Sequence, residues 1–397
     1  MPPVLEASEP NASLVLKTPS QDTGLLEYPQ ELSYLDPELT DVVHGLIEKA
    51  RMRQDESVRG RRGWQTLAEQ RKLHMACEGR SPEAVQAYLE IKRKEADRSF
   101  TPEEIARWTR EYGFRPVQDP VAAAVKLIIV STESGLAYFV RMLDEHHNKG
   151  LHLPSMAPFL KYWVADEFDH QLGTAFVMSI QDDLPADYDL EQKAINMAEF
   201  HIKFGVYAGP LEALTYATIQ EFLTQRTYQQ AIRYFLGKIP RLDPLNRLSE
   251  EEKRQPIDPF MADYYVPIAQ DEGYHHGVFL SALKAHLQNK PDRLALVYDC
   301  LRLFKMPGAN WPNFQARGAL MAAAGLYSPV SELDVIFHEI LTLKLDFENL
   351  PTPPGSLGAM AKKKIREYYP LERKRRERLE TIMKRRVLRA YKTEISS

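Results

Sequence analysis

A short motif occurs twice in this 397-residue chain, each time inside a stretch with the composition of a helix. The first copy, in "YWVADEFDHQ", carries Glu167 and His170, and the second copy, in "PIAQDEGYHH", carries Glu272 and His275. Side chains three residues apart lie on one face of a helix, so each pair can converge on a single point. Carboxylate and imidazole groups together bind divalent first-row metal ions. The repeated motif therefore predicts a metal site.

Two further carboxylates interrupt apolar stretches. Glu133 lies in "VAAAVKLIIVSTESGLAYFV", residues 121–140, and Glu221 lies in "YATIQEFLTQRTY". A carboxylate inside such a helix is costly unless it is paired or binds a metal. The order Glu, Glu-x-x-His, Glu, Glu-x-x-His is the pattern by which four-helix bundles build a di-iron or di-manganese site. The expected metal ligands are Glu133, Glu167, His170, Glu221, Glu272 and His275.

Two of these ligands have neighbours that could replace them. His276 lies four residues after Glu272 and could bind instead of His275, although the spacing of the first motif favours His275. Glu212 competes with Glu221, but it follows a proline at an expected helix start, where the helix dipole alone explains an acid. We therefore keep His275 and Glu221 as the expected ligands.

An aspartate precedes the glutamate in each motif copy. Asp166 and Asp271 could accept hydrogen bonds from the imidazole N–H groups that do not face the metals. For Asp166, exposure to solvent on the helix surface is an equal alternative.

The elements that would carry these residues are helices. Acids and capping residues beside proline mark helix starts at Asp36, Ser81 and Thr101, and strand signals are nearly absent. The predicted fold is all-α, a four-helix bundle core with additional N- and C-terminal helices. The longest expected helices cover 121–147, 155–181, 189–208, 210–237, 260–288 and 291–305.

The charge is distributed unevenly along the chain. Its formal net charge is −4, yet Lys362–Lys392 holds 14 lysines and arginines against four glutamates, a local charge of +10. Apolar residues at helical spacing predict that this segment is an amphipathic helix. A solvated face of a packed helix is the favoured interpretation. Docking of an acidic protein, nucleic acid or an anionic membrane surface is the alternative.

Composition also bounds the compartment and the cofactor. Two distant cysteines, Cys77 and Cys300, argue against a disulfide framework. The first 20 residues lack a secretory signal, and no apolar run is long enough to span a membrane because Lys126 and Glu133 interrupt the longest one. A cytoplasmic protein is expected. No glycine-rich nucleotide motif occurs.

Four stretches of the chain resemble one family. "STESGLAYF", "YWVADEFDHQ", "TIQEFLT" and "IAQDEGYHH" are similar to the four metal helices of the soluble acyl-acyl-carrier-protein desaturases, the stearoyl-type, ferritin-like di-iron enzymes. The resemblance covers about half of the chain, residues 115–305. It implies the same six iron ligands. It also implies that Trp163 and Asp271 lie beside the ligands and that the hydroxyl of Thr224 lies beside the oxygen site.

We expect the chain to divide into four parts. A mobile N-terminal tail would occupy 1–30, and helices packing on the core would occupy 31–114. The ferritin-like di-iron bundle would span 115–348, followed at 349–397 by a linker and the basic C-terminal helix.

The resemblance also implies cofactors and partners. Two Fe ions with O2 as co-substrate, acyl-carrier protein or another acyl substrate, a ferredoxin-like electron donor and a homodimer would follow, with no nucleic acid partner. The chain departs from the family at Phe168 and Asp169, at Phe222, and at Gly273 with Tyr274. His276 stands where the family has an acid, and the loop between the last two ligand helices is longer than usual.

The expected function is therefore O2-dependent introduction of a double bond into an acyl chain. Aromatic residues near the ligands could line an acyl channel, but ordinary bundle core is the favoured interpretation; they are Tyr138, Phe139, Phe168, Phe176, Phe222 and Phe279. A related di-iron oxygenase that hydroxylates or N-oxidises another substrate is the main alternative. Iron storage, and a structural or nucleic-acid-binding bundle that uses the basic tail, are the others.

Overall fold

The computed structural model describes residues 118–132, 157–181, 210–307 and 314–393. This part of the chain is helical nearly throughout and contains no strand, which confirms the all-α prediction for these residues. The helices expected over 31–114 and 189–208 lie outside the described residues, as does the N-terminal tail. No described helix has both the length and the apolar character needed to cross a bilayer.

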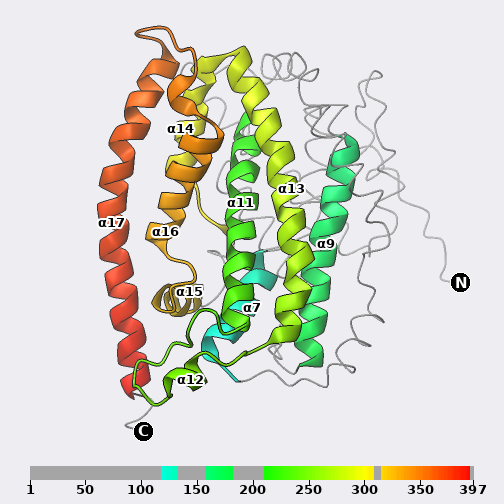
Figure 1. Cartoon of the computed structure of the whole chain (residues 1–397). Helices are drawn as coiled ribbons and strands as arrows, with labels where there is room; N and C mark the ends of the chain where they lie inside the picture. Colours follow the sequence, from blue (N-terminus) through cyan, green and yellow to red (C-terminus); the bar gives the residue numbers. More distant parts are fainter. Residues whose placement is uncertain (1–117, 133–156, 182–209, 308–313, 394–397) are drawn as a thin grey trace, which may run out of the picture.

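Four helices cover the stretches singled out by the sequence, the first of them as far as the residue before Glu133. They are α7 (Pro120–Thr132), α9 (Ala157–Ile180), α11 (Pro210–Phe235) and α13 (Pro259–Asn289). α11 packs along α13, which also contacts α9, and α7 contacts both α9 and α11 (Figure 1). Three of the expected helices agree with α9, α11 and α13 to within a few residues. The structure describes the helix expected over 121–147 as far as Thr132.

The C-terminal part adds a second group of helices beside the first. After η3 (Pro291–Arg293) come α14 (Leu294–Leu303) and α15 (Phe314–Ala323), then α16 (Pro329–Asp334), which continues into the π-helical segment η5 (Val335–Lys344). The short η6 (Phe347–Asn349) precedes α17 (Leu357–Thr393). α17 packs against α14, α15 and α16 and lies at the edge of the molecule in Figure 1. The sequence did not predict α15, α16 or η5.

Local capping explains where several helices begin. The Asp258 side chain accepts a hydrogen bond from the backbone N–H of Met261, and Pro259 occupies the first turn of α13. Such caps satisfy N–H groups that have no partner within the helix. Ser249 forms a capping box at the short helix α12 (Glu250–Lys253), within the loop between α11 and α13. The helix starts therefore follow from short-range sequence signals.

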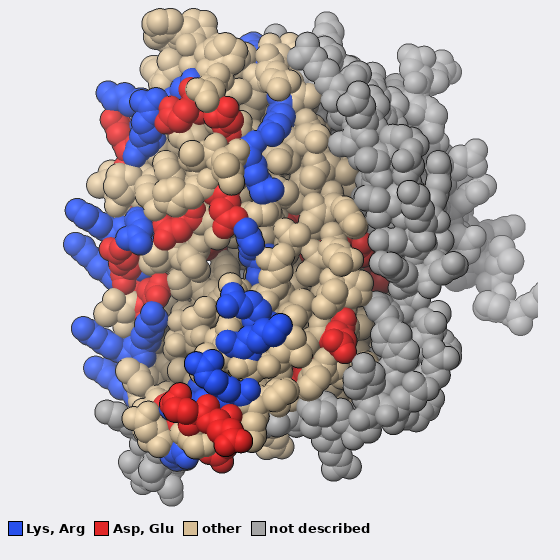
Figure 2. All heavy atoms as spheres, viewed as in Figure 1, with Lys and Arg blue, Asp and Glu red and all other residues tan. Residues whose placement is uncertain are grey.

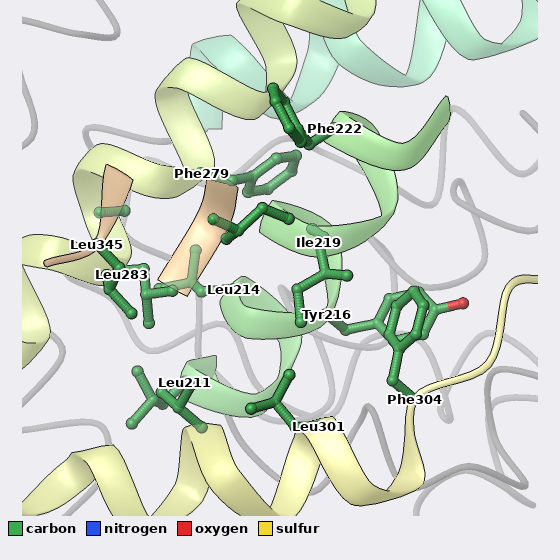
Figure 3. Packing of buried hydrophobic residues seen from close by; sticks show 14 of the residues in the cluster. Leu211, Leu214, Tyr216, Ile219, Phe222, Phe279, Leu283, Leu301, Phe304 and Leu345 are labelled. Atoms are coloured by element: carbon green, nitrogen blue, oxygen red, sulfur yellow. The ribbon is translucent and has the colours of Figure 1, made fainter. Parts of the chain in front are cut away.

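Two apolar clusters form the core. The first apolar cluster takes residues from the N-terminal halves of α9 and α11 and the C-terminal half of α13. The second apolar cluster takes the C-terminal ends of α9 and α11, the N-terminal half of α13, and α7. Figure 3 shows part of the first cluster, where α11 side chains meet those of α13 and α14; the labelled residues include Leu211, Leu214, Ile219, Phe222, Phe279, Leu283 and Leu301.

The two apolar clusters are separated along α9 and α13 by a stretch that holds the Glu-x-x-His motifs. On α9 the first cluster ends at Val164 and the second begins at Val177. On α13 the second cluster ends at Ala269 and the first begins at Val278. The two Glu-x-x-His motifs fall into these gaps. The polar residues of the motifs are therefore enclosed between two apolar layers.

A buried ion pair joins three helices at the far end of the second apolar cluster. Lys126 Nζ of α7 lies 2.7 Å from Asp258 Oδ2, at the start of α13, and both side chains are almost fully buried. The same ammonium group donates a hydrogen bond of 2.9 Å to Gln181 Oε1, directly after α9. The lysine that interrupts the apolar run of α7 thus has a structural role.

We predict that Lys126→Met destabilises the fold by about 3–5 kcal/mol, because it leaves the buried carboxylate of Asp258 without its cation. The free energy of unfolding in urea, followed by circular dichroism, measures this effect. Lys363→Met is the matched control because Lys363 pairs with Glu367 on the surface of α17, and its loss should cost under about 0.5 kcal/mol. Equal effects from both variants would contradict the role of the buried pair.

His286 makes the stability of the fold sensitive to pH. Its ring is buried in α13, and Nδ1 lies 2.6 Å from a guanidinium nitrogen of Arg293. Burial and then the charge of Arg293 lower the pKa of His286 from 6.5 to about 3. Between these two pH values the unfolded chain binds a proton that the folded chain does not. The free energy of unfolding is therefore unaffected by this residue above pH 6.5, and it decreases as the pH falls from 6.5 towards 3.

We predict that His286→Gln flattens the pH dependence of unfolding in this window, where each pH unit costs the wild type about 1.4 kcal/mol through this residue. Glutamine can still accept a hydrogen bond from Arg293. Urea unfolding at several pH values gives the slope. A His286→Gln slope equal to that of the wild type would disprove the assignment.

Candidate metal centre

Three carboxylates and one imidazole meet between the two apolar clusters. Glu167 of α9, Glu221 of α11, and Glu272 and His275 of α13 each direct one ligand atom into a space where all four atoms lie within 4.8 Å of one another. All four side chains are fully buried. Buried carboxylates this close repel each other strongly unless a cation or a proton neutralises them. The group could hold a metal ion.

The two motif histidines both face this group. His170 Nδ1 lies 3.1 Å from Glu272 Oε1, which joins the first motif to the second. His275 Nδ1 lies 3.5 Å from Glu167 Oε1 and 3.3 Å from Glu221 Oε2. The structure therefore brings together five of the six expected ligands. The sixth, Glu133, lies outside the described residues and stays a prediction.

Each motif aspartate contacts the histidine of the other motif. Asp166, in the first motif, lies with Oδ2 3.0 Å from Nε2 of His275. Asp271, in the second motif, lies with Oδ2 3.5 Å from Nε2 of His170. An acceptor at one ring nitrogen orients the imidazole and directs its other nitrogen to a metal. The sequence suggested this role for both residues, and the structure removes the solvent-exposed alternative for Asp166.

The electrostatic environment favours positive charge at the centre. Burial alone would lower the pKa of His275, but hydrogen bonds with Asp166 and Glu221, and then their charges, raise it from 6.5 to about 9. The surrounding carboxylates thus stabilise a cation at this point. A divalent ion with the same oxygen and nitrogen neighbours would supply that charge, so these residues fit a transition metal.

An aromatic shell closes the site on the side of the first apolar cluster. Trp163 Nε1 donates a hydrogen bond of 3.2 Å to Glu221 Oε1, which places Trp163 beside a ligand as expected. The rings of Trp163 and Phe279 meet edge to face with centroids 5.2 Å apart, and Phe159 lies edge-on to His275 at 6.2 Å. These rings exclude water from the carboxylates, and the hydrogen bond from Trp163 fixes the position of the Glu221 side chain.

Thr224 lies one helical turn after Glu221. Its hydroxyl donates to the backbone carbonyl of Gln220, 3.0 Å away, and its side chain lines a narrow, mostly apolar cavity of about 20 Å³. That volume suffices for about one water molecule. The other lining residues are Ile128, Ile129, Thr227, Met306, Gly318, Met321 and Tyr327.

Four of the aromatic residues weighed as a channel do not line this cavity. Phe222 and Phe279 belong to the first apolar cluster, and Phe168 packs against it. Phe176 packs against the second cluster. These four are core residues, as the favoured interpretation held, whereas Tyr138 and Phe139 lie outside the described residues.

The two rival ligands have other surroundings. His276 Nδ1 lies 2.9 Å from the carbonyl oxygen of Thr218, and its ring stacks obliquely on Phe222 at 4.7 Å. Burial lowers the pKa of His276 to about 4, against the opposing effect of the Thr218 carbonyl, so this imidazole is neutral. Glu212 is buried in the first turn of α11, away from the metal group. His275 and Glu221 are confirmed as members of that group.

Gly273 has a packing role that sequence reasoning missed. The amide of Gln225 on α11 occupies the place where a side chain at Gly273 would begin. The same amide donates to the backbone carbonyl of Ala269 at 3.2 Å. A glycine directly after a proposed ligand was the signal in the sequence. It lets α11 make a side-chain contact with α13 next to Glu272.

Comparisons with known proteins do not place the chain in a family. No protein-family model matches it, and no curated protein is similar to it in sequence.

The aspartates should control metal affinity. We predict that Asp166→Asn and Asp271→Asn each weaken binding of Fe²⁺ or Mn²⁺ by about 10–100-fold, because each leaves an imidazole without its orienting carboxylate. Anaerobic calorimetric titration of metal-free protein gives the dissociation constants. The matched control is Asp169→Asn, an exposed aspartate on the same helix, which should bind as the wild type does. Unchanged affinity in both motif variants would contradict the reciprocal arrangement.

Proposed function

We propose that this protein is an O2-dependent di-iron oxidoreductase that introduces a double bond into an acyl chain. The observation that carries the proposal is the reciprocal arrangement of two Asp-Glu-x-x-His motifs around three buried carboxylates. Neither a structural bundle nor a nucleic-acid-binding bundle needs such a group in its core, because a buried cluster of acids only destabilises it.

The proposed architecture is a ferritin-like bundle built from α7, α9, α11 and α13. The order of the motif residues on these helices and their convergence support it. Glu133 directly follows the last described residue of α7 and would supply the sixth ligand. Two Fe ions would then be held by four carboxylates and two imidazoles, Glu133, Glu167, His170, Glu221, Glu272 and His275.

A reduced di-iron pair, if held by these residues, would supply with O2 an oxidant strong enough to remove hydrogen from an unactivated CH2 group. The chain's own residues hold and shield the site. The aspartates orient the two imidazoles, Trp163 holds Glu221, and the two apolar clusters exclude water. Thr224, one helical turn after Glu221, lines a small apolar cavity.

The family resemblance suggests the partners. We propose acyl-carrier protein as the carrier of the substrate, a ferredoxin-like protein as the electron donor, a homodimer and a cytoplasmic location.

A related oxygenase that hydroxylates or N-oxidises its substrate is the second candidate. One observation favours it: the cavity at Thr224 has a volume of about 20 Å³, room for about one water molecule, which is small for a long acyl chain. Both candidates use the same ligands, so only the product separates them.

Removing a ligand should abolish metal loading without unfolding the protein. We predict that Glu221→Ala and His275→Ala lose bound iron, measured by elemental analysis after anaerobic reconstitution, and keep the helical circular dichroism spectrum. The matched control is His276→Gln, which changes the adjacent imidazole and can still hydrogen-bond to Thr218; it should load iron as the wild type does. Full iron loading and activity in the Glu221→Ala, His275→Ala double variant would refute the proposed site.

The reaction itself is tested by its product. Iron-loaded protein, reduced ferredoxin, O2 and a saturated acyl-acyl-carrier protein should give an acyl chain lighter by two hydrogen atoms in the mass spectrum. A product heavier by one oxygen atom would identify the oxygenase instead. Consumption of O2 without change in any acyl substrate would argue against both reactions on acyl chains.

A further inference from the structure

The outward face of α17 carries a regular pattern. Met360, Leu371 and Ile382 follow one another at intervals of 11 residues, about three helical turns, so all three point the same way. Each is followed, three and four residues later, by two cations on the same face. We call this set the basic-apolar face of α17; its members are Met360, Lys363, Lys364, Leu371, Lys374, Arg375, Ile382, Arg385 and Arg386.

All nine side chains of this face are exposed. Leu371 is 70% exposed, and more than half of the large apolar side chains that are exposed in the described part of the chain belong to α17. Figure 2 shows lysines and arginines projecting along the edge of the molecule where α17 lies. An exposed helix face that combines apolar side chains with many cations has the composition of helices that lie on membrane surfaces.

The opposite face of α17 fixes the helix to the body. Ala361, Ile365 and Val387 are buried there. Arg376 Nη1 lies 2.7 Å from Glu332 Oε1 of α16, and Arg373 Nε lies 3.2 Å from Asp334 Oδ1. The helix is therefore a fixed element of the fold, and its packing leaves the basic-apolar face outward.

The charge on this face is largely uncompensated. Within the described part of the chain, Lys374, Arg385 and Arg386 take part in no ion pair. Lys363 contacts Glu367, and Arg375 contacts Glu372. The face thus presents a line of positive charge to whatever approaches it.

The distribution of apolar groups selects the kind of partner. Met360 to Ile382 spans about 33 Å of helix, with single apolar side chains spaced between cations rather than gathered into the compact centre typical of a protein interface. A nucleic acid would use the cations but not the leucine and isoleucine. A second copy would oppose one positive face to another. An anionic lipid surface is extended, attracts cations and accepts apolar side chains.

We propose that the basic-apolar face of α17 docks the protein on the surface of anionic lipid membranes. Lysines and arginines would contact the phosphate headgroups, and Met360, Leu371 and Ile382 would enter the boundary between headgroups and acyl chains. This inference does not depend on the proposed function, because α17 lies outside the metal centre. The docking would be peripheral.

The test is co-sedimentation of the full-length protein with vesicles of phosphatidylcholine alone and of phosphatidylcholine mixed with phosphatidylglycerol. Binding is expected only to the mixed vesicles. Lys374→Glu, Arg385→Glu, Arg386→Glu together should weaken it at least tenfold, since each cation near an anionic surface contributes roughly fivefold. Leu371→Ser with Ile382→Ser should also weaken it several-fold while leaving all charges in place.

Control variants match each change elsewhere on the surface. Lys238→Glu, Arg247→Glu, Arg254→Glu reverses the same number of exposed cations, and Leu343→Ser replaces an apolar side chain that is 76% exposed on η5. Both should bind mixed vesicles as the wild type does, and circular dichroism should show every variant folded. Absence of vesicle binding would overturn the proposal. So would binding unaffected by the Leu371→Ser, Ile382→Ser pair, or salt-sensitive binding to duplex DNA without vesicle binding, which would assign the face to nucleic acid.

Discussion

The core of this protein encloses a cluster of like charges. Three carboxylates with ligand atoms within 4.8 Å of one another lie in the core, and the apolar clusters on either side deny them water. Such a group needs a compensating cation. The carboxylates raise the pKa of His275, so this imidazole supplies part of that compensation, and a metal would supply the rest. The apolar layers, the aromatic shell and the orienting aspartates all serve to keep this group closed and ordered.

The reciprocal aspartate–histidine contacts couple the site to the fold. Asp166 reaches from α9 to His275, and Asp271 reaches from α13 to His170. These two contacts hold the helices at one relative height, because sliding by a turn, about 5.4 Å, would break both. Two kinds of contact thus fix the relative heights of the helices. The aspartate–histidine contacts act beside the expected ligands, and the ion pair of Lys126 with Asp258 acts farther along the helices.

Much of the site could be predicted from the sequence because helices convert spacing into direction. Glu167, His170, Glu221, Glu272 and His275 were found from three-residue spacing and from acids in apolar stretches, and His275 was separated from His276 by the same argument. The pairing of each aspartate with the other motif could not be fixed, since it depends on how two helices approach. The cavity beside Thr224 depends on Met321 of α15, which lies far along the chain. The π-helical segment η5 has no signal in its apolar pattern.

The proposed di-iron site is tested by the metal content of the aerobically purified protein. Its absorption spectrum is measured alongside, before and after dithionite and after renewed exposure to O2. We predict about two irons per chain, as a site of four carboxylates and two imidazoles holds, with charge-transfer bands that bleach on reduction and return with O2. A protein that contains no metal and takes up neither iron nor manganese on reconstitution would contradict it. The buried acids would then be part of the scaffold only.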